Sequence, residues 1–124
     1  MMSDGFKILD GFPDPVLAVE AIGKVDAQAY ETVLIPAIED KLSALGKIKL
    51  LYIIGDSFDG FTLGAAWDDT KVGLTHLGDF SKIALVSDVE WIRLGMRAFA
   101  PMIPGEMRLF SLAERQQAED WIAA

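Results

Sequence analysis

The sequence predicts one α/β domain with a mixed, mostly parallel sheet flanked by helices in the order ββαβαβαβα. Three observations carry this prediction. The 124 residues lie within the usual range for a single domain with one core. After an initial pair of strands, apolar β-type runs alternate with segments of helical spacing. No repeat, linker or low-complexity tract divides residues 1–124, so we expect a single folding unit.

The first strands are short and lie on either side of a turn. Residues 6–10 and 16–22 are β-type runs, and residues 11–15, with two prolines and a glycine, connect them. This connection predicts an antiparallel pair at a sheet edge. Residues 48–54 form a nearly continuous apolar run, which predicts a central strand covered by helices on its faces.

The first helix is predicted between these strands. Asp26 is its expected N-cap, apolar residues recur at helical spacing as far as Leu45, and Gly46 ends the pattern. Pro36 lies inside this pattern and removes a backbone donor. We therefore expect the helix to kink or split there.

The second half continues the alternation. Residues 55–60 are predicted as a loop, and residues 63–77 as a helix closed by Gly78. Residues 80–86 and 107–110 are predicted as further strands.

Two capping boxes mark the starts of the remaining helices. Ser87 and Glu90 have the required spacing ahead of a helix over residues 89–100, and Ser111 and Glu114 repeat it before a C-terminal helix. That last helix should turn Ala118, Trp121 and Ile122 toward the core.

Composition excludes several classes of function. The chain has no cysteine, so disulfides, thiolate metal sites and a cysteine nucleophile are excluded. A net charge of −8 repels phosphate backbones, so nucleic acid is not an expected partner. The N-terminus has no secretory signal pattern, and the apolar runs fall short of the ~20 residues that span a bilayer. We expect a cytoplasmic protein that meets a membrane, if at all, at the inner face.

Conventional catalytic constellations are not apparent. His76 is the single histidine, and no second imidazole or nucleophile accompanies it. The carboxylates of Asp56, Asp59, Asp68 and Asp69 gather within fourteen positions but match no metal-binding loop, so a metal-dependent enzyme is the weakest alternative. No glycine pattern predicts a phosphate cradle. We expect no enzyme activity, no cofactor and no metal.

Three segments together resemble the SpoIIAA-like family, a branch of the STAS fold that is also compared with the lipid-binding CRAL-TRIO fold. They are GFTLGAAWDD (60–69), FSKIALVSDVEW (80–91) and GEMRLFS (105–111), the last followed by residues 118–122. The resemblance covers almost all of the chain after residue 45. It implies the fold, and CRAL-TRIO similarity implies a helix that moves as a gate.

The resemblance also implies a regulatory alternative. STAS domains that antagonise anti-sigma factors are switched by phosphorylation in the loop after the central strand, and Ser57 occupies that place here. A phosphate there would sit beside Asp56 and Asp59, near the start of the next predicted helix. Phe58 and Asp59 depart from the Asp-Ser-Ser-Gly pattern of the phosphorylated proteins. The alternative reading is a strand-to-helix turn.

Residues 91–104 contain more apolar side chains than one helix face needs. One stripe, Trp91, Leu94, Gly95 and Ala98, would suffice for packing on the sheet. A second stripe consists of Ile92, Met96, Phe99 and Ile103. The surplus stripe predicts a ligand pocket, a subunit interface or a membrane contact, unless both stripes are core.

Charge distinguishes the same region. Between residues 91 and 108 three arginines stand against Glu106 alone, a local charge of +2 in a chain of −8. An apolar face with a basic flank is typical of helices that lie in an anionic membrane surface.

We therefore expect a non-enzymatic domain that binds an apolar or lipid-like ligand or a peripheral membrane surface through a mobile helix over residues 91–103. A homodimer would also hide the surplus apolar face. The candidate binding residues are Trp67, Trp91, Ile92, Met96, Phe99, Met102 and Ile103, with Arg93, Arg97 and Arg108 as a basic flank.

Overall fold

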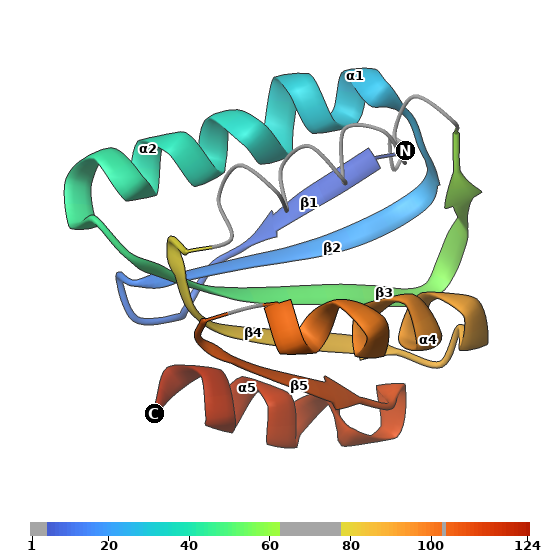
Figure 1. Cartoon of the computed structure of the whole chain (residues 1–124). Helices are drawn as coiled ribbons and strands as arrows, with labels where there is room; N and C mark the ends of the chain where they lie inside the picture. Colours follow the sequence, from blue (N-terminus) through green and yellow to red (C-terminus); the bar gives the residue numbers. More distant parts are fainter. Residues whose placement is uncertain (1–4, 63–77, 103) are drawn as a thin grey trace.

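Five strands form one sheet in sequence order (Figure 1). The computed structural model describes residues 5–62, 78–102 and 104–124. The strands are β1 (Gly5–Leu9), β2 (Val16–Val25), β3 (Ile48–Phe61), β4 (Phe80–Ser87) and β5 (Glu106–Phe110). β1 pairs with β2 antiparallel, and the three pairs that follow are parallel. This confirms the mixed, mostly parallel sheet and the antiparallel pair at its edge.

Helices cover both faces of the sheet (Figure 1). One face packs against α1 (Ala27–Ala29), a π-helical turn (Tyr30–Leu34), α2 (Ile35–Leu45) and α4 (Glu90–Phe99). The other face packs against α5 (Arg115–Ala123). Short 3-10 turns, Ala100–Met102 and Leu112–Glu114, follow α4 and precede α5.

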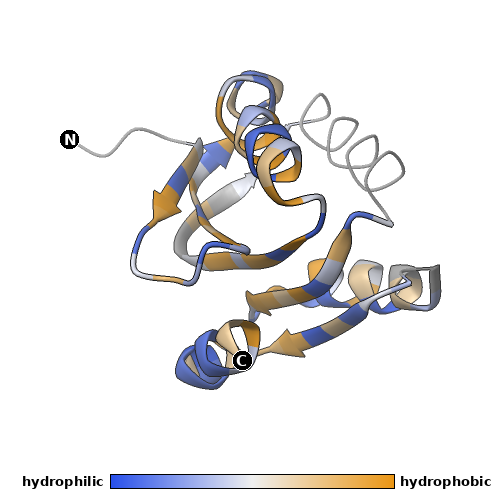
Figure 2. Ribbon diagram, turned by 90° about the vertical axis from the view of Figure 1, so that its left-hand side faces the viewer, coloured by the Kyte–Doolittle hydropathy of each residue, from blue (hydrophilic) through white to orange (hydrophobic). Residues whose placement is uncertain are grey.

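The central strand β3 supplies side chains to both layers. Leu50, Tyr52 and Ile54 belong to the cluster under α2, whereas Leu51 and Ile53 belong to the cluster under α5. Because alternate residues of a strand point to opposite faces, a strand covered on both sides must be apolar throughout. In Figure 2 much of the sheet is orange, and α5 has a hydrophilic side.

The first helix begins and ends where the sequence predicts. The Asp26 carboxylate accepts a hydrogen bond from the backbone N–H of Ala29 at 2.9 Å, and Gly46 ends the helix with φ of +81°. The interruption at Pro36 takes the form of a π-helical turn in which the Ile35 N–H donates to the Tyr30 carbonyl. We attribute this turn to Pro36, which cannot donate and crowds the preceding turn.

Residues 55–60 are not a loop, which corrects the prediction. β3 continues through them to Phe61, and Phe58 and Gly60 pair with Gly23 and Lys24 of β2 after two register shifts. Glycine and aspartate are depleted in strands, and this local preference predicted a loop. The longer β2 offers pairing partners that override it.

The first of the two predicted capping boxes does not form. Ser87 is still part of β4 and fully buried, and its hydroxyl accepts a hydrogen bond from the Val89 N–H at 3.0 Å. Helix α4 begins at Glu90 with no side-chain cap. The second box is confirmed, because Glu114 accepts from the Ser111 N–H at 2.9 Å and the Ser111 side chain accepts in return.

The inner side of α5 is as predicted. Ala118 and Ile122 are completely buried against the sheet, and Trp121 is half-buried beside Phe110. Within the described residues, no helix is long and apolar enough to cross a bilayer. The helix predicted over residues 63–77, with Trp67, Asp68, Asp69 and His76, lies outside the described residues.

Replacing Ile122 by alanine should lower the free energy of unfolding by about 2–5 kcal/mol, because it leaves a cavity under α5. Leu45→Ala is the matched control: Leu45 is 45% exposed at the end of α2, so this change should cost about 0.5 kcal/mol or less. Urea denaturation measures both. Equal losses in the two variants would contradict the packing of α5 described here.

The capping box should make stability depend on pH through Glu114. Hydrogen bonds from the Ser111 backbone and then its side chain, with a smaller contribution from the Arg93 charge, hold the pKa of Glu114 below its ordinary value of 4.5. A lowered pKa in the folded state adds stability above the unfolded pKa and loses it as the pH falls through the folded pKa. The stability difference between wild type and Glu114→Gln should therefore shrink on acidification below 4.5. Urea midpoints across this pH range test it, and a constant difference would contradict it.

Candidate functional site

Helix α4 exposes the apolar stripe that was expected to face the sheet. Trp91 is 60% and Leu94 58% exposed, and Gly95 and Ala98 are exposed beside them. Ile92, from the stripe expected to be surplus, is 8% exposed and belongs to the core under α2. The helix does carry a surplus stripe, but its two faces are the reverse of the prediction.

The binding residues predicted on this helix are divided accordingly. Trp91 lies on the outer face, whereas Ile92 is buried and Met96 is half-buried against the same core. Trp67, Ile103 and the side chains of Phe99 and Met102 lie outside the described part of the chain. Of the seven predicted binding residues, Trp91 is the one whose described side chain is exposed.

Arg93 explains the rotation of α4. Its guanidinium donates to the backbone carbonyls of Ser87 and Phe110 at 2.8 and 3.0 Å. These carbonyls end β4 and β5, so one guanidinium joins two neighbouring strand ends to the first turn of the helix. Because the side of α4 that carries Arg93 must face the strand ends, the Trp91 side turns outward. Charge-assisted hydrogen bonds of this kind are stronger than neutral ones.

The predicted basic flank is split between two faces of the sheet. Arg93 is occupied by the strand carbonyls, and Arg97 is exposed on α4. Arg108 pairs in register with Ala84, whose side chain lies in the cluster under α5, so Arg108 also points to the α5 face. There its guanidinium carbon lies 5.0 Å from the centre of the Trp121 ring. Arg108 is therefore no part of the α4 surface, because alternate strand residues face opposite sides.

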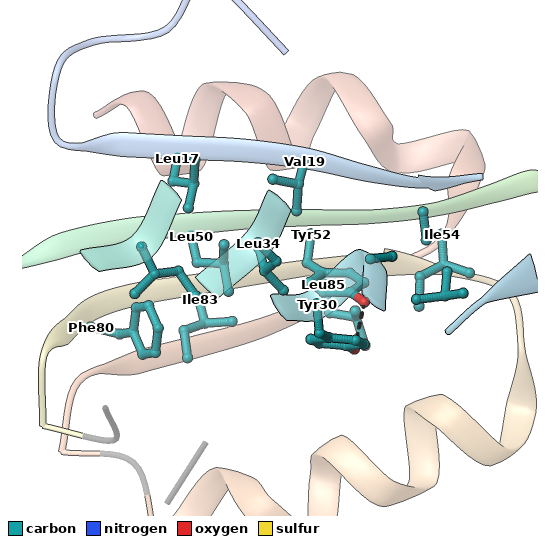
Figure 3. Packing of buried hydrophobic residues seen from close by; sticks show 14 of the residues in the cluster. Leu17, Val19, Tyr30, Leu34, Leu50, Tyr52, Ile54, Phe80, Ile83 and Leu85 are labelled. Atoms are coloured by element: carbon teal, nitrogen blue, oxygen red, sulfur yellow. Dashed lines mark hydrogen bonds between the residues drawn. The ribbon is translucent and has the colours of Figure 1, made fainter. Parts of the chain in front are cut away.

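A buried pair of tyrosines is a feature that the sequence did not single out. The hydroxyls of Tyr30 and Tyr52 lie 3.1 Å apart between the π-helical turn and β3 (Figure 3). The Phe6 ring meets both tyrosine rings edge-on, at centroid distances of 4.9 and 5.7 Å. A buried hydroxyl needs a partner, so each tyrosine satisfies the other inside an apolar layer. Tyr30 lies in the predicted first helix and Tyr52 in the predicted central strand, but the contact between them depends on how the helix crosses the strand.

The predicted phosphorylation site is not at a strand-to-helix turn. The backbone of Ser57 lies in the extension of β3 beside β2, as do the backbones of Asp56 and Asp59. Their side chains lie outside what the structure describes. In the described ranges, no three histidine, cysteine or acidic residues gather where they could hold a metal ion.

A surface hollow of about 150 Å³ lies at the β1–β2 connection, and no residue of α4 lines it. It is bounded by Ile8, Leu9, Asp10, Gly11, Phe12, Val16, Leu17, Ala18 and Lys41. The Lys41 ammonium donates to the Asp14 carbonyl at 2.7 Å and so ties α2 to this connection. The hollow and the exposed face of α4 are therefore separate features of the surface.

Arg93→Met should lower the free energy of unfolding by about 1.5–3 kcal/mol, since it removes two charge-assisted hydrogen bonds from strand-end carbonyls. Arg97→Met, one turn further along the same helix, is the matched control and should change stability by about 0.5 kcal/mol or less. Urea denaturation of both variants is the measurement. If Arg93→Met were as stable as Arg97→Met, Arg93 would not fix the helix.

Comparisons with known proteins agree with this architecture. A family model for SpoIIAA-like proteins matches residues 16–123. The fold is also similar to a crystal structure from Shewanella loihica PV-4, described as an uncharacterized protein of the DUF3478 family with a SpoIIAA-like fold. The two sequences are 32% identical, the match covers 98% of each chain, and the TM-score is 0.73. No protein of curated function matches the sequence. The chain belongs to the SpoIIAA-like family.

Proposed function

We propose that this chain is a non-enzymatic binding domain that docks on an anionic membrane surface through the outer face of α4. The observation that carries the proposal is the exposure of Trp91 and Leu94, which lie one helical turn apart and are 60% and 58% exposed. Four large apolar side chains are exposed among the described residues, and these two are the pair that shares one helix. Such a concentration on one helix favours a contact surface.

The chemistry of this face suits a membrane interface. A helix with one apolar and one polar side lies in the interface plane with its apolar side among the lipid headgroups and upper acyl chains. Tryptophan is enriched at that depth because its ring is apolar and its N–H is polar. Trp91 and Leu94 would enter the lipid, and Ile92 and Met96 would keep the helix on the sheet.

The magnitudes indicate which term dominates. Full burial of one large apolar side chain contributes roughly 1.5–3 kcal/mol. A basic residue near an anionic surface contributes about 1 kcal/mol, and Arg97 is the exposed arginine on α4. The net charge of −8 opposes approach to an anionic surface. We therefore expect apolar insertion to supply most of the affinity and binding to be reversible.

The alternatives are weaker on these observations. The hollow at the β1–β2 connection is lined by no residue of α4, so this hollow gives no support to an apolar ligand held under α4. A switch at Ser57 was argued from a loop before a helix, and the backbone there is strand. Movement of α4 as a gate stays a prediction.

Flotation with vesicles of phosphatidylcholine and phosphatidylglycerol tests the proposal. The wild-type protein should float, and Trp91→Ser with Leu94→Ser should reduce the partition coefficient more than about tenfold, because both apolar anchors are lost. Leu45→Ser is the matched control, since Leu45 is 45% exposed on α2, and it should float like wild type.

Two outcomes would overturn the proposal. One is a wild-type protein that stays in the bottom fraction of the gradient, away from the vesicles, whether or not phosphatidylglycerol is present. The other is a wild-type dimer in sedimentation that the Trp91→Ser, Leu94→Ser variant converts to a monomer, because α4 would then be a subunit interface.

A further inference from the structure

Two cations share one aromatic ring on the face of the sheet opposite α4. The Lys82 ammonium and the Arg108 guanidinium carbon each lie 5.0 Å from the centre of the Trp121 ring. Lys82 comes from β4, Arg108 from the edge strand β5, and Trp121 from the last turn of α5. Trp121 in turn packs against Phe110, with 6.1 Å between ring centres. Three elements thus fix the position of the cation pair.

Backbone carbonyls near the end of α5 account for the lysines of this face. Lys82 donates to the Trp121 carbonyl at 3.4 Å, and Lys49, its register neighbour on β3, donates to the Ala124 carbonyl at 2.6 Å. Lysine at a helix C-terminus offsets the unpaired carbonyls and the partial negative charge there. A structural role therefore explains both lysines.

Arg108 has no such explanation. Its side chain is exposed, and within the described residues it has neither a hydrogen bond nor a carboxylate within ion-pair distance. Glu106 lies beside Lys82 in the register but forms no ion pair with either cation in the described part of the chain. On α5, the Glu119 and Asp120 carboxylates are bound by Arg115 and Gln116. The part of the chain that the structure describes thus supplies no anionic partner for these two like charges at one ring.

A guanidinium held against a ring is prepared to bind an oxyanion. Contact with Trp121 restricts the long Arg108 side chain while its N–H donors remain unused, so less entropy is lost on binding. The planar fork of donors fits carboxylate and phosphate oxygens in a bidentate manner. The Lys82 ammonium keeps two donors beyond the one given to Trp121 and adds a second charge.

We propose that Arg108 and Lys82, held on Trp121, form a binding site for an oxyanion of the phosphate or carboxylate class. The site lies on the α5 face of the sheet, so it is independent of membrane docking by α4. The same chemistry accepts a free anion or an anionic group of a larger molecule.

Titration by NMR tests this site with defined probes. Inorganic phosphate, succinate and chloride are added at constant ionic strength to the ¹⁵N-labelled protein, and the indole N–H signal of Trp121 is assigned from its loss in Trp121→Phe. Phosphate or succinate should shift this signal in a saturable manner, and chloride should not. Tighter binding of phosphate would identify the phosphate class, and tighter binding of succinate the carboxylate class.

Variants make the assignment specific. Arg108→Gln should weaken the anion at least about tenfold, since it removes the bidentate donor. Arg108→Lys should recover part of the affinity because it restores the charge. Arg115→Gln removes a cation from α5, the helix that carries Trp121, but outside the proposed site, and this variant should bind the anion like wild type. Shifts that do not saturate, or equal affinity in Arg108→Gln and Arg115→Gln, would overturn the proposal.

Discussion

The surface of this protein depends on two hydrogen bonds from Arg93. Its guanidinium bridges the carbonyls that end β4 and β5, and these bonds fix the rotation of α4 about its own axis, so that one side of the helix faces the sheet. Helix α4 has two apolar stripes, so packing alone could place either stripe against the sheet. If the Trp91 side faced the sheet, Arg93 would point away from the strand ends and their carbonyls would lose this charged donor, so these two hydrogen bonds select one orientation. Trp91 and Leu94 are exposed as a consequence.

The parallel sheet separates the two proposed sites. Parallel strands require helices on their faces, and here α1, α2 and α4 cover one face while α5 covers the other. The apolar surface on α4 and the cation pair on Trp121 therefore lie in different layers.

Membership of the SpoIIAA-like family establishes the fold, and the residues argue for the function. The chain shares 32% of its residues with the Shewanella loihica protein over nearly its full length, so the backbone arrangement is common to both. Binding on one face is inferred from Trp91 and Leu94, and anion binding on the other from Arg108 and Lys82. A fold hosts many functions, so the side chains at each site have to carry the argument.

The sequence by itself determined the order of the described elements, the burial of β3, and the capping of α1 and of the 3-10 turn before α5, because each depends on neighbours in the chain. Asp26, Gly46 and the Ser111–Glu114 pair act within one turn of their own helix. The tertiary structure decided the extension of β3 past Ile54, the rotation of α4 and the separation of Arg108 from Arg93. Each of these depends on a partner distant in sequence: β2 for the strand, two strand ends for the helix, and strand parity with α5 for Arg108. Local periodicity fits either face of α4, and only a contact between separate elements distinguishes them.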